Sequence, residues 1–445
     1  MADFKPLFFQ FARDPKREPV LVDYVRTPIG KRRGKMVRIR ADDMLVLCIR
    51  RLVERTKLEE TGRVVDDVVV GCNSQIGECA LDVARTAALA AGLDYRTPGT
   101  TVNRQCASGM QAVMFAWQQI ATCQHDVVIA GGVEGQNKYA IGSDMIVDGV
   151  QYPPNRKIVK NPSLVRASKE AAQKGGKFGP RLAQLAGQIQ AAELMGWVWG
   201  AEREELDRLS LRSHEKACDP ANAEKRQKEM FPVEVPKLDE NGKPILDDAG
   251  QMVPGETETC DQDESPRPNT NLEIMAKLRP IVLRRSGLLT AGNSCPTSDG
   301  AAATMWMARG VAEELGMPIR ATLVGCAVVG TDPILMLTGP IEATPRVLKQ
   351  VGGASLDDVD FIEINEAFST VVYASCKELG LDWDDPRLNQ WGGAIALGHP
   401  TGMTGCRLIG TLVHQLEDAQ KAYGLGTLCV GWGMGIAGVV KREGA

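Results

Sequence analysis

The sequence lacks the charge excess and the long apolar runs that mark two classes of protein. Its 52 Lys and Arg residues against 56 Asp and Glu residues give a formal net charge of -4, which provides no overall attraction to phosphate backbones or anionic lipid. No apolar run is long enough to cross a bilayer. We therefore expect no nucleic-acid partner and no membrane span. The basic cluster of Lys31, Arg32, Arg33 and Lys35 either binds an anion locally or forms a solvated loop.

Paired cysteines are also missing. The 12 cysteines include no C-x-x-C pair and none of the paired spacings of metal sites, so we expect no metal, no disulfide framework and a reducing compartment. Charges interrupt the short apolar patch within residues 1–19, and Asp3 and Asp14 argue against a mitochondrial leader. The final residues, KREGA, do not match a peroxisomal signal. We expect a cytoplasmic location, with the mitochondrion as the alternative.

Short apolar runs rich in β-branched residues are present near both ends of the chain, between helical patterns. Seven runs predict strands: 20–25, 67–72, 126–132, 322–330, 360–365, 427–432 and 436–441. This alternation is typical of α/β domains with parallel sheets covered by helices. From about 139 to 285 the chain is polar and has little strand pattern, and residues 211–230 predict a polar amphipathic helix.

We interpret the polar stretch as an insertion into the first of two α/β domains. Residues 1–138 begin the first domain, 139–288 form the inserted loop domain, 289–315 complete the first domain, and 316–445 form the second. The two outer parts show the same order of segments, because NRQCASGMQAV and ALGHPTGMTGCRLI each lead through a helix into a strand. This internal repeat predicts a duplicated domain with sites that meet across a pseudo-twofold axis.

Cys106 is the first candidate for catalysis. It stands where a polar stretch gives way to small residues and then to a helical apolar pattern, so we expect its thiol near a helix N-terminus. There the free N–H groups and the helix dipole favour a thiolate, and the N–H of Cys106 would face an oxyanion on an attached acyl group. Most cysteines are buried structural residues, and only its setting and partners distinguish Cys106.

His399 is the candidate base. It lies between a glycine and a proline in the glycine-rich run 391–405, where the backbone can approach another segment closely. Imidazole has a pKa suited to accepting a proton from a thiol near neutral pH. The other histidines, His125, His214 and His414, precede a strand or lie in polar or amphipathic helices, which indicates surface or packing roles.

Polar groups also lie at the ends of two predicted strands. Cys429 ends an apolar strand and enters a glycine-rich turn, where its thiol could exchange a proton with a substrate and the Gly431 N–H could face an anion. A packing role for Cys429 is equally consistent with this pattern. Asn365 and Glu366 lie at a strand's C-terminal edge, where open α/β sheets place ligand-binding groups, although such a pair also caps helices.

Taken together, these segments resemble the thiolase family from about residue 19 to residue 441. NRQCASGMQAV resembles its nucleophile motif, INEAF its Asn-Glu-Ala-Phe motif, GGAIALGHPTG its histidine motif and CVGWGMG its last Cys-x-Gly motif, in the expected order. The resemblance implies an α/β fold of two similar domains in an αβαβα layered arrangement, with a loop domain inserted in the first. It also implies a homodimer or homotetramer, coenzyme A as co-substrate and no covalently bound cofactor.

The resemblance implies a role for each matching residue. Cys106 would be the acylated nucleophile, His399 its base, and Cys429 the acid and base for the acetyl-CoA enolate and for coenzyme A. Asn365, through a water, would form one oxyanion site with His399, and the N–H groups of Cys106 and Gly431 would form the other.

The sequence departs from the family's pattern around the expected site. Ala291, Ser294 and Cys295 match a stretch expected to contact coenzyme A, but Cys295 replaces a common serine. Trp391 and Trp432 replace the usual Asn and Gly, so they either line the acyl pocket and favour a small, cyclic or aromatic acyl group, or pack at the domain interface.

Two further departures lie outside the four motifs. The segment 131–139, GGVEGQNKY, differs from the family's usual Gly-Gly-x-Glu-Ser-Met-Ser, which bears on the coenzyme A contacts. Trp197 and Trp199 are expected at the substrate mouth or in the core of the inserted region.

We therefore expect an acetyl-CoA C-acyltransferase that cleaves 3-ketoacyl-CoA with coenzyme A by ping-pong chemistry, in the degradation of fatty, cyclic or aromatic acyl chains. Three alternatives stay open: a biosynthetic acetoacetyl-CoA-forming thiolase, a catalytically silent lipid-CoA binding protein, and a condensing enzyme such as a ketoacyl synthase. The last normally uses two histidines, so Cys429 argues against it. An associated hydratase/dehydrogenase subunit also stays open.

Overall fold

The computed structural model describes residues 14–445. Residues 1–13, which carry most of the interrupted apolar patch at the chain's start, lie outside the described residues. None of the described helices is long and apolar enough to cross a membrane. Lys31, Arg32 and Arg33 are exposed, and Lys35 pairs with Glu258 at 2.9 Å, an arrangement that fits a solvated loop.

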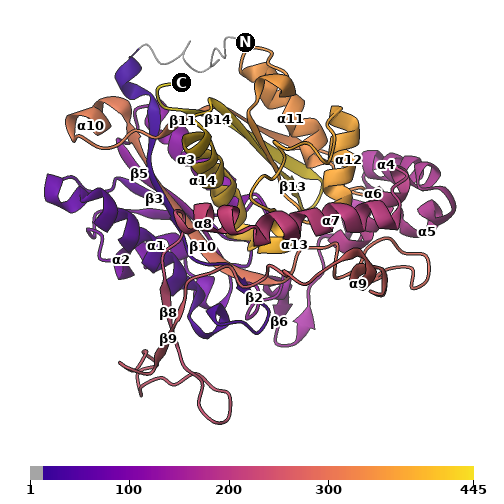
Figure 1. The fold of residues 1–445 in the computed structure, drawn as a ribbon, viewed down its shortest axis with the longest axis horizontal. Coiled ribbons are helices and arrows are strands. Elements are labelled where there is room, and N and C mark those ends of the chain that lie inside the picture. Colours follow the sequence, from indigo (N-terminus) through magenta and orange to yellow (C-terminus); the bar gives the residue numbers. More distant parts are fainter. Residues whose placement is uncertain (1–13) are drawn as a thin grey trace.

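One large mixed sheet runs through both halves of the chain (Figure 1). Its strand order is β12-β13-β14-β11-β1-β10-β5-β3-β4, with β2 paired to β10. The strands are β1 (Pro19–Arg26), β2 (Gly30–Lys31), β3 (Asp67–Gly71), β4 (Gly99–Val102), β5 (Val127–Gly135), β10 (Ser298–Ala308), β11 (Ala321–Gly330), β12 (Phe361–Ile364), β13 (Tyr423–Val430) and β14 (Met434–Arg442). The seven predicted strands are therefore confirmed, whereas β2, β4 and β10 are not among the predicted runs.

The prediction of parallel sheets is wrong for the centre of this sheet. The pairs β3–β4, β3–β5 and β12–β13 are parallel, whereas β1, β10, β11 and β14 pair antiparallel with their neighbours. Only three residues separate β13 from β14, and so short a connection can join only antiparallel strands. β10 returns from the inserted segment between β1 and β5 and runs against both.

Helices form the remaining layers. They are α1 (Ala41–Thr56), α2 (Val83–Ala90), α3 (Ser108–Ala121), α10 (Arg309–Glu314), α11 (Gly339–Gln350), α12 (Ser369–Leu379), α13 (Ala394–Leu397) and α14 (Thr401–Ala419). α3 and α14 pack together between the two halves of the sheet, α1 and α2 cover the outer face of the first half, and α11 and α12 cover that of the second (Figure 1). This is the αβαβα layering that the resemblance implies.

Glycines let α3 and α14 cross very closely. A Cβ on Gly109 of α3 would lie 2.5 Å from the carbonyl oxygen of Gly402, and a Cβ on Gly405 of α14 would lie 2.3 Å from the backbone nitrogen of Met110. Larger side chains would separate the two backbones, because Cβ atoms do not approach other atoms so closely. Since Cys106 and His399 each lie just before the first turn of one of these helices, the crossing brings their segments together.

Between β5 and β10 the chain leaves the sheet (Figure 1). This excursion contains β6 (Ile146–Val147), β7 (Val150–Gln151), α4 (Pro162–Lys174), α5 (Gly179–Leu182), α6 (Gln188–Val198), α7 (Arg203–Cys218), α8 (Pro220–Gln227), β8 (Val233–Pro236), β9 (Thr257–Cys260) and α9 (Leu272–Ala276). The single helix predicted for 211–230 is two helices. Pro220 begins α8, and the Asp219 carboxylate accepts the N–H groups of Ala221 and Asn222 as an N-cap.

Candidate active site

Cys106 lies in a tight turn between β4 and α3. Gln105 has a φ of 49°, a backbone conformation that costs a non-glycine residue on the order of 1–3 kcal/mol. The Gln105 N–H donates to Asn103 Oδ1 at 2.8 Å, and the Ser108 hydroxyl donates to the Gln105 carbonyl oxygen at 2.6 Å. These bonds hold the turn in place, so Cys106 comes directly before the helix, as the sequence predicts.

The thiol of Cys106 is buried, with only 3% of the residue exposed. The Gly431 backbone N–H bonds to it, and Gln188 Nε2 at the start of α6 lies 3.8 Å from its Sγ. Burial nevertheless raises the pKa of the Cys106 thiol to about 11, because the loss of solvation outweighs these two donors. The expectation of a resting thiolate is therefore wrong, and the free site holds a neutral thiol.

Hydrogen bonds around His399 support a proton on Nδ1. Thr404 Oγ1 lies 2.8 Å from the Pro400 carbonyl oxygen and 2.7 Å from His399 Nδ1, and we assign its hydrogen to the carbonyl, so that the hydroxyl accepts from Nδ1. Nε2 is then unprotonated and accepts from Asn365 Nδ2 at 3.3 Å. Burial, and the charge of Arg407, lower the pKa of His399 to about 3. The imidazole is neutral, as a general base requires, and its Nε2 lone pair, which accepts from Asn365, is the position that takes up a proton.

Two polar side chains, one at the start of β10 and one directly after β5, hold the backbone of His399. Its N–H donates to Ser298 Oγ at 3.2 Å, and its carbonyl accepts from Gln136 Nε2 at 2.9 Å. The Ser298 N–H in turn donates to Gln136 Oε1 at 3.0 Å. Gln136 belongs to the segment 131–139, which departs from the family's pattern, and it supports the loop of residues 392–400 that carries His399, which we call the histidine loop.

Glu134 joins three segments beneath the site. Its carboxylate accepts the N–H groups of Asn73, Ser74 and Gly402 and the hydroxyl of Thr401. Burial raises the pKa of Glu134, although these donors act in the opposite direction. The carboxylate therefore fixes the N-terminus of α14, where the histidine loop enters the helix.

Glu366 makes a similar junction on the other side. It accepts from the Ser213 hydroxyl at 2.6 Å, from Asn389 Nδ2 at 2.9 Å and from the Ile395 N–H at 3.1 Å. The Gly393 N–H donates to Ser213 Oγ at 3.1 Å. The segment before His399 is thus bonded both to the INEAF segment and to helix α7 of the excursion.

Known protein families match nearly the whole chain. Residues 19–310 match the thiolase N-terminal domain, and residues 317–442 match the thiolase C-terminal domain. The chain belongs to the thiolase family. Family membership makes it an acyltransferase with coenzyme A as co-substrate.

Full-length relatives agree with this assignment to the thiolase family. A 3-ketoacyl-CoA thiolase of Bacillus subtilis is 36% identical over 428 residues, 96% of this chain and 99% of that protein. A steroid 3-ketoacyl-CoA thiolase of Mycobacterium tuberculosis is 36% identical over 425 residues, 96% of this chain and 94% of that protein. The crystal structure of the dimeric peroxisomal thiolase of Saccharomyces cerevisiae has a TM-score of 0.79 and 29% identity, covering 98% of this chain and 100% of that one.

Three cysteines of this thiolase-family chain lie within electrostatic reach of one another. Burial raises the pKa of Cys429 well above its ordinary range, and charges on Cys106 and Cys295 would raise it further. Cys295 keeps some solvent contact, yet the surrounding protein raises the pKa of its thiol to about 12. Of the other residues expected to contact coenzyme A, Ala291 is exposed and Ser294 is buried.

The tryptophans that depart from the thiolase pattern lie in different surroundings. Trp432, next to Gly431, is 38% exposed and has a φ of 67°, whereas Trp391 is only 1% exposed. Trp197 donates to Glu193 at 2.9 Å and packs on Phe178. Trp199 donates from its indole to Glu378 at 2.7 Å.

Sequence reasoning missed several residues around the expected thiolase site. Thr404 lies close to His399 in the chain, so the need of a base for an orienting partner could have indicated it. Gln188 and Ser298 lie far from the four motifs in sequence and carry no local signal. Among residues 14–445, no three or more His, Cys, Asp or Glu side chains are placed to hold a metal ion.

Proposed function

We propose that this enzyme cleaves 3-ketoacyl-CoA with coenzyme A through an acyl group carried on Cys106, in the degradative direction. The relatives named 3-ketoacyl-CoA thiolase support the substrate class. The observation that carries the assignment of roles is the pair of contacts on the His399 ring: Nδ1 bonds to Thr404, and Nε2, assigned as unprotonated, faces Asn365 Nδ2.

In the first half-reaction, Sγ of Cys106 attacks the 3-keto carbon while its proton passes to His399 Nε2. The bond between C2 and C3 then breaks, leaving an acyl thioester on Cys106 and the enolate of acetyl-CoA. The enolate takes the thiol proton of Cys429 and leaves as acetyl-CoA. Because the resting thiol and imidazole are neutral, charge appears only as the substrate reacts, and the N–H groups of Cys106 and Gly431 would stabilise one oxyanion.

In the second half-reaction, coenzyme A gives its thiol proton to the Cys429 thiolate and attacks the thioester carbon. The tetrahedral intermediate releases the shortened acyl-CoA and the Cys106 sulfur, which recovers its proton from His399. Asn365 would act on the other oxyanion through a water, together with His399. A thioester on cysteine is close in energy to a CoA thioester, so both halves are reversible.

We also propose a homodimer, a cytoplasmic location and coenzyme A contacts at Ala291, Ser294 and Cys295. The description of the yeast relative as dimeric supports the dimer. The return of β10 to the sheet beside β5 supports the division into 1–138, 139–288, 289–315 and 316–445. A homotetramer and an associated hydratase/dehydrogenase subunit stay predictions.

An assay of acetyl-CoA release tests this function, with acetoacetyl-CoA and longer 3-ketoacyl-CoA thioesters as substrates. We expect coenzyme-A-dependent release by the purified protein, and mass spectrometry of the enzyme incubated with substrate alone should find one acyl group, on Cys106. Cys106→Ser should abolish release, whereas the control Cys376→Ser, at a buried packing cysteine, should retain it. Release unaffected by Cys106→Ser, or an acyl group on another cysteine, would contradict the proposal.

A further inference from the structure

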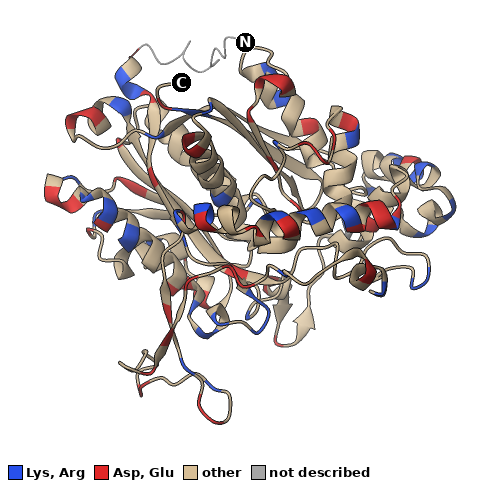
Figure 2. Ribbon diagram, in the orientation of Figure 1, with Lys and Arg blue, Asp and Glu red and all other residues tan. Residues whose placement is uncertain are grey.

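Three side chains of the excursion hold the backbone just before the histidine loop. Lys216 Nζ donates to the carbonyl oxygen of Leu388 at 2.6 Å. Asn222 Nδ2 donates to that of Gln390 at 3.2 Å, and Arg226 Nη1 donates to that of Trp391 at 2.7 Å. We call Lys216, Asn222 and Arg226 the carbonyl clamp. Charged residues of both signs lie along α7 (Figure 2), and the clamp shows that some polar residues of α7 and α8 face inward.

The clamped segment packs directly on the end of α7. Gly392 has a φ of 88°, and a Cβ on it would lie 2.7 Å from Cβ of Ala217. Arg226 also donates to the Ala217 carbonyl, so one guanidinium group bridges the end of α7 and the start of the histidine loop. Neither the end of α7 nor the backbone at Trp391 can move without breaking these contacts.

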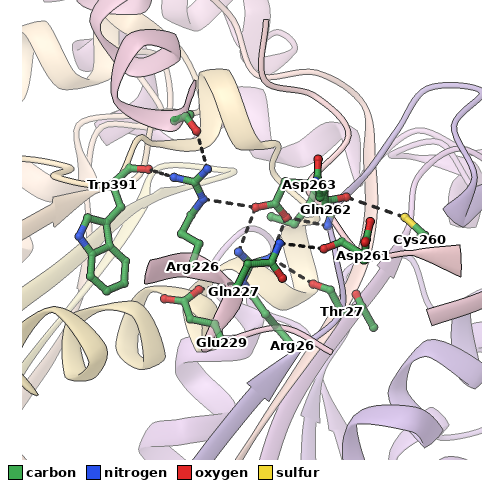
Figure 3. Close-up of polar contacts among 12 residues, drawn as sticks. Arg26, Thr27, Arg226, Gln227, Glu229, Cys260, Asp261, Gln262, Asp263 and Trp391 are labelled. Carbon is green, nitrogen blue, oxygen red and sulfur yellow. Dashed lines mark hydrogen bonds and ion pairs between the residues drawn. The ribbon is translucent and has the colours of Figure 1, made fainter. Parts of the chain in front are cut away.

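Arg226 is itself one member of a buried cluster of four charged side chains (Figure 3). Its Nε lies 3.6 Å from Asp263 Oδ2, Asp263 bonds to Arg26 at 2.7 and 3.0 Å, and Arg26 bonds to Glu229 at 2.8 Å. Burial opposes the charge on Asp263, but Arg26 and Arg226 hold the pKa of its carboxyl below the ordinary value. Because Arg26 lies on β1, the cluster anchors the clamp to the central sheet.

The path from the clamp to the imidazole is short. Only the single turn α13 and a few flanking residues separate Trp391 from His399. At the far end, Ser298, Gln136 and Thr404 hold His399. The clamp therefore fixes the near end of the loop whose far end carries His399 and is already held.

We propose that Arg226 is a positioning residue for His399: its bonds to Trp391 and Ala217 set the start of the histidine loop and so make the base dependent on the excursion. This inference rests on the proposed role of His399 as the base. A displacement of about 1 Å between reacting groups can cost on the order of a hundredfold in rate. Loss of Arg226 should thus lower turnover without weakening substrate binding.

Arg226→Met tests the proposal, with Arg212→Met as the matched control. Arg212 also lies in the excursion, donates to the carbonyls of Trp383 and Asp385 and pairs with Asp384, but these partners lie farther from His399 along the chain than Trp391 does. We expect Arg226→Met to lower kcat about tenfold or more, with KM changed less than about twofold. It should also slow alkylation of Cys106 by iodoacetamide. Arg212→Met should leave both rates near wild type, and Arg226→Lys should recover part of the loss.

Equal kcat values for Arg226→Met and Arg212→Met, or a raised KM with kcat unchanged, would overturn the positioning role. If Arg226→Met does not fold, Asn222→Ala removes the Gln390 bond without unbalancing the charges and should show a smaller loss of the same kind. Wild-type kinetics in that variant would count against the proposal. Because alkylation requires no thiolase turnover, an inactive wild-type enzyme would refute the proposed function while the alkylation rates still test the clamp.

Discussion

Thr404→Val tests whether the hydroxyl of Thr404 fixes the reactive tautomer of His399. Valine has nearly the same shape but cannot accept the Nδ1 proton, so a buried N–H would lose its partner. Leaving a buried donor unsatisfied costs about 1–3 kcal/mol, and this cost falls only on the tautomer with a free Nε2. Since about 1.4 kcal/mol corresponds to a tenfold change in rate, we expect kcat to fall roughly 5- to 150-fold.

Steady-state thiolysis of acetoacetyl-CoA measures this effect, and alkylation of Cys106 by iodoacetamide reports separately on the base. Thr404→Ser keeps the hydroxyl and should retain most of the activity. Thr411→Val is the matched control, because Thr411 is also buried on α14 and its hydroxyl has no hydrogen-bond partner among the described residues. A wild-type kcat in Thr404→Val, or an equal loss in Thr411→Val, would refute the tautomer argument.

Two other changes give separate predictions. Trp432→Gly should lower the free energy of unfolding by on the order of 1 kcal/mol, because loss of the covered part of the indole and the freedom of glycine in the unfolded chain outweigh relief of the positive φ; denaturant titration measures this. If the indole lines the acyl pocket, the same change, or Trp391→Ala, should alter the kcat/KM ratio of cyclic to straight-chain substrates, and unchanged selectivity would remove that role. Burial raises the pKa of Glu363 to about 7 from 4.5, so wild-type stability should fall as pH rises from about 4.5 to 7, because the folded protein retains a proton that the unfolded chain loses. Glu363→Gln should remove this fall, and at pH 8 the variant should be more stable than the wild type by on the order of 3 kcal/mol. Urea unfolding curves measure this. A stability difference between variant and wild type that is the same at pH 5 and at pH 8 would contradict the raised pKa of Glu363.

Local patterns were enough to predict seven strands of the sheet and the place of Cys106 before a helix. A strand's alternation and a helix's first turn depend on neighbouring residues, so both can be recognised in a short window. The break at Asp219 and Pro220 also had a local signal, which the reading of 211–230 as one helix overlooked. The inward direction of Lys216, Asn222 and Arg226 had none, because their carbonyl partners lie more than 150 residues away.

The protonation of the site is the clearest example of what a sequence leaves undecided. A cysteine at a helix N-terminus predicts a thiolate, yet burial raises the pKa of Cys106 to about 11 and, together with Arg407, lowers that of His399 to about 3. The desolvation of an ionisable group depends on all the atoms packed around it, and these come from both halves of the chain and from the excursion.

By itself, the sequence determined the family, the elements and the residue types that meet at the site, since motifs and periodicity are local properties of a chain. Only the tertiary structure decided that the sheet is mixed, that Thr404 and Asn365 contact the two ring nitrogens of His399 and that the excursion holds the histidine loop. These features depend on contacts between segments that are distant in sequence. Such contacts, and the burial of the side chains that make them, exist only after the chain has folded.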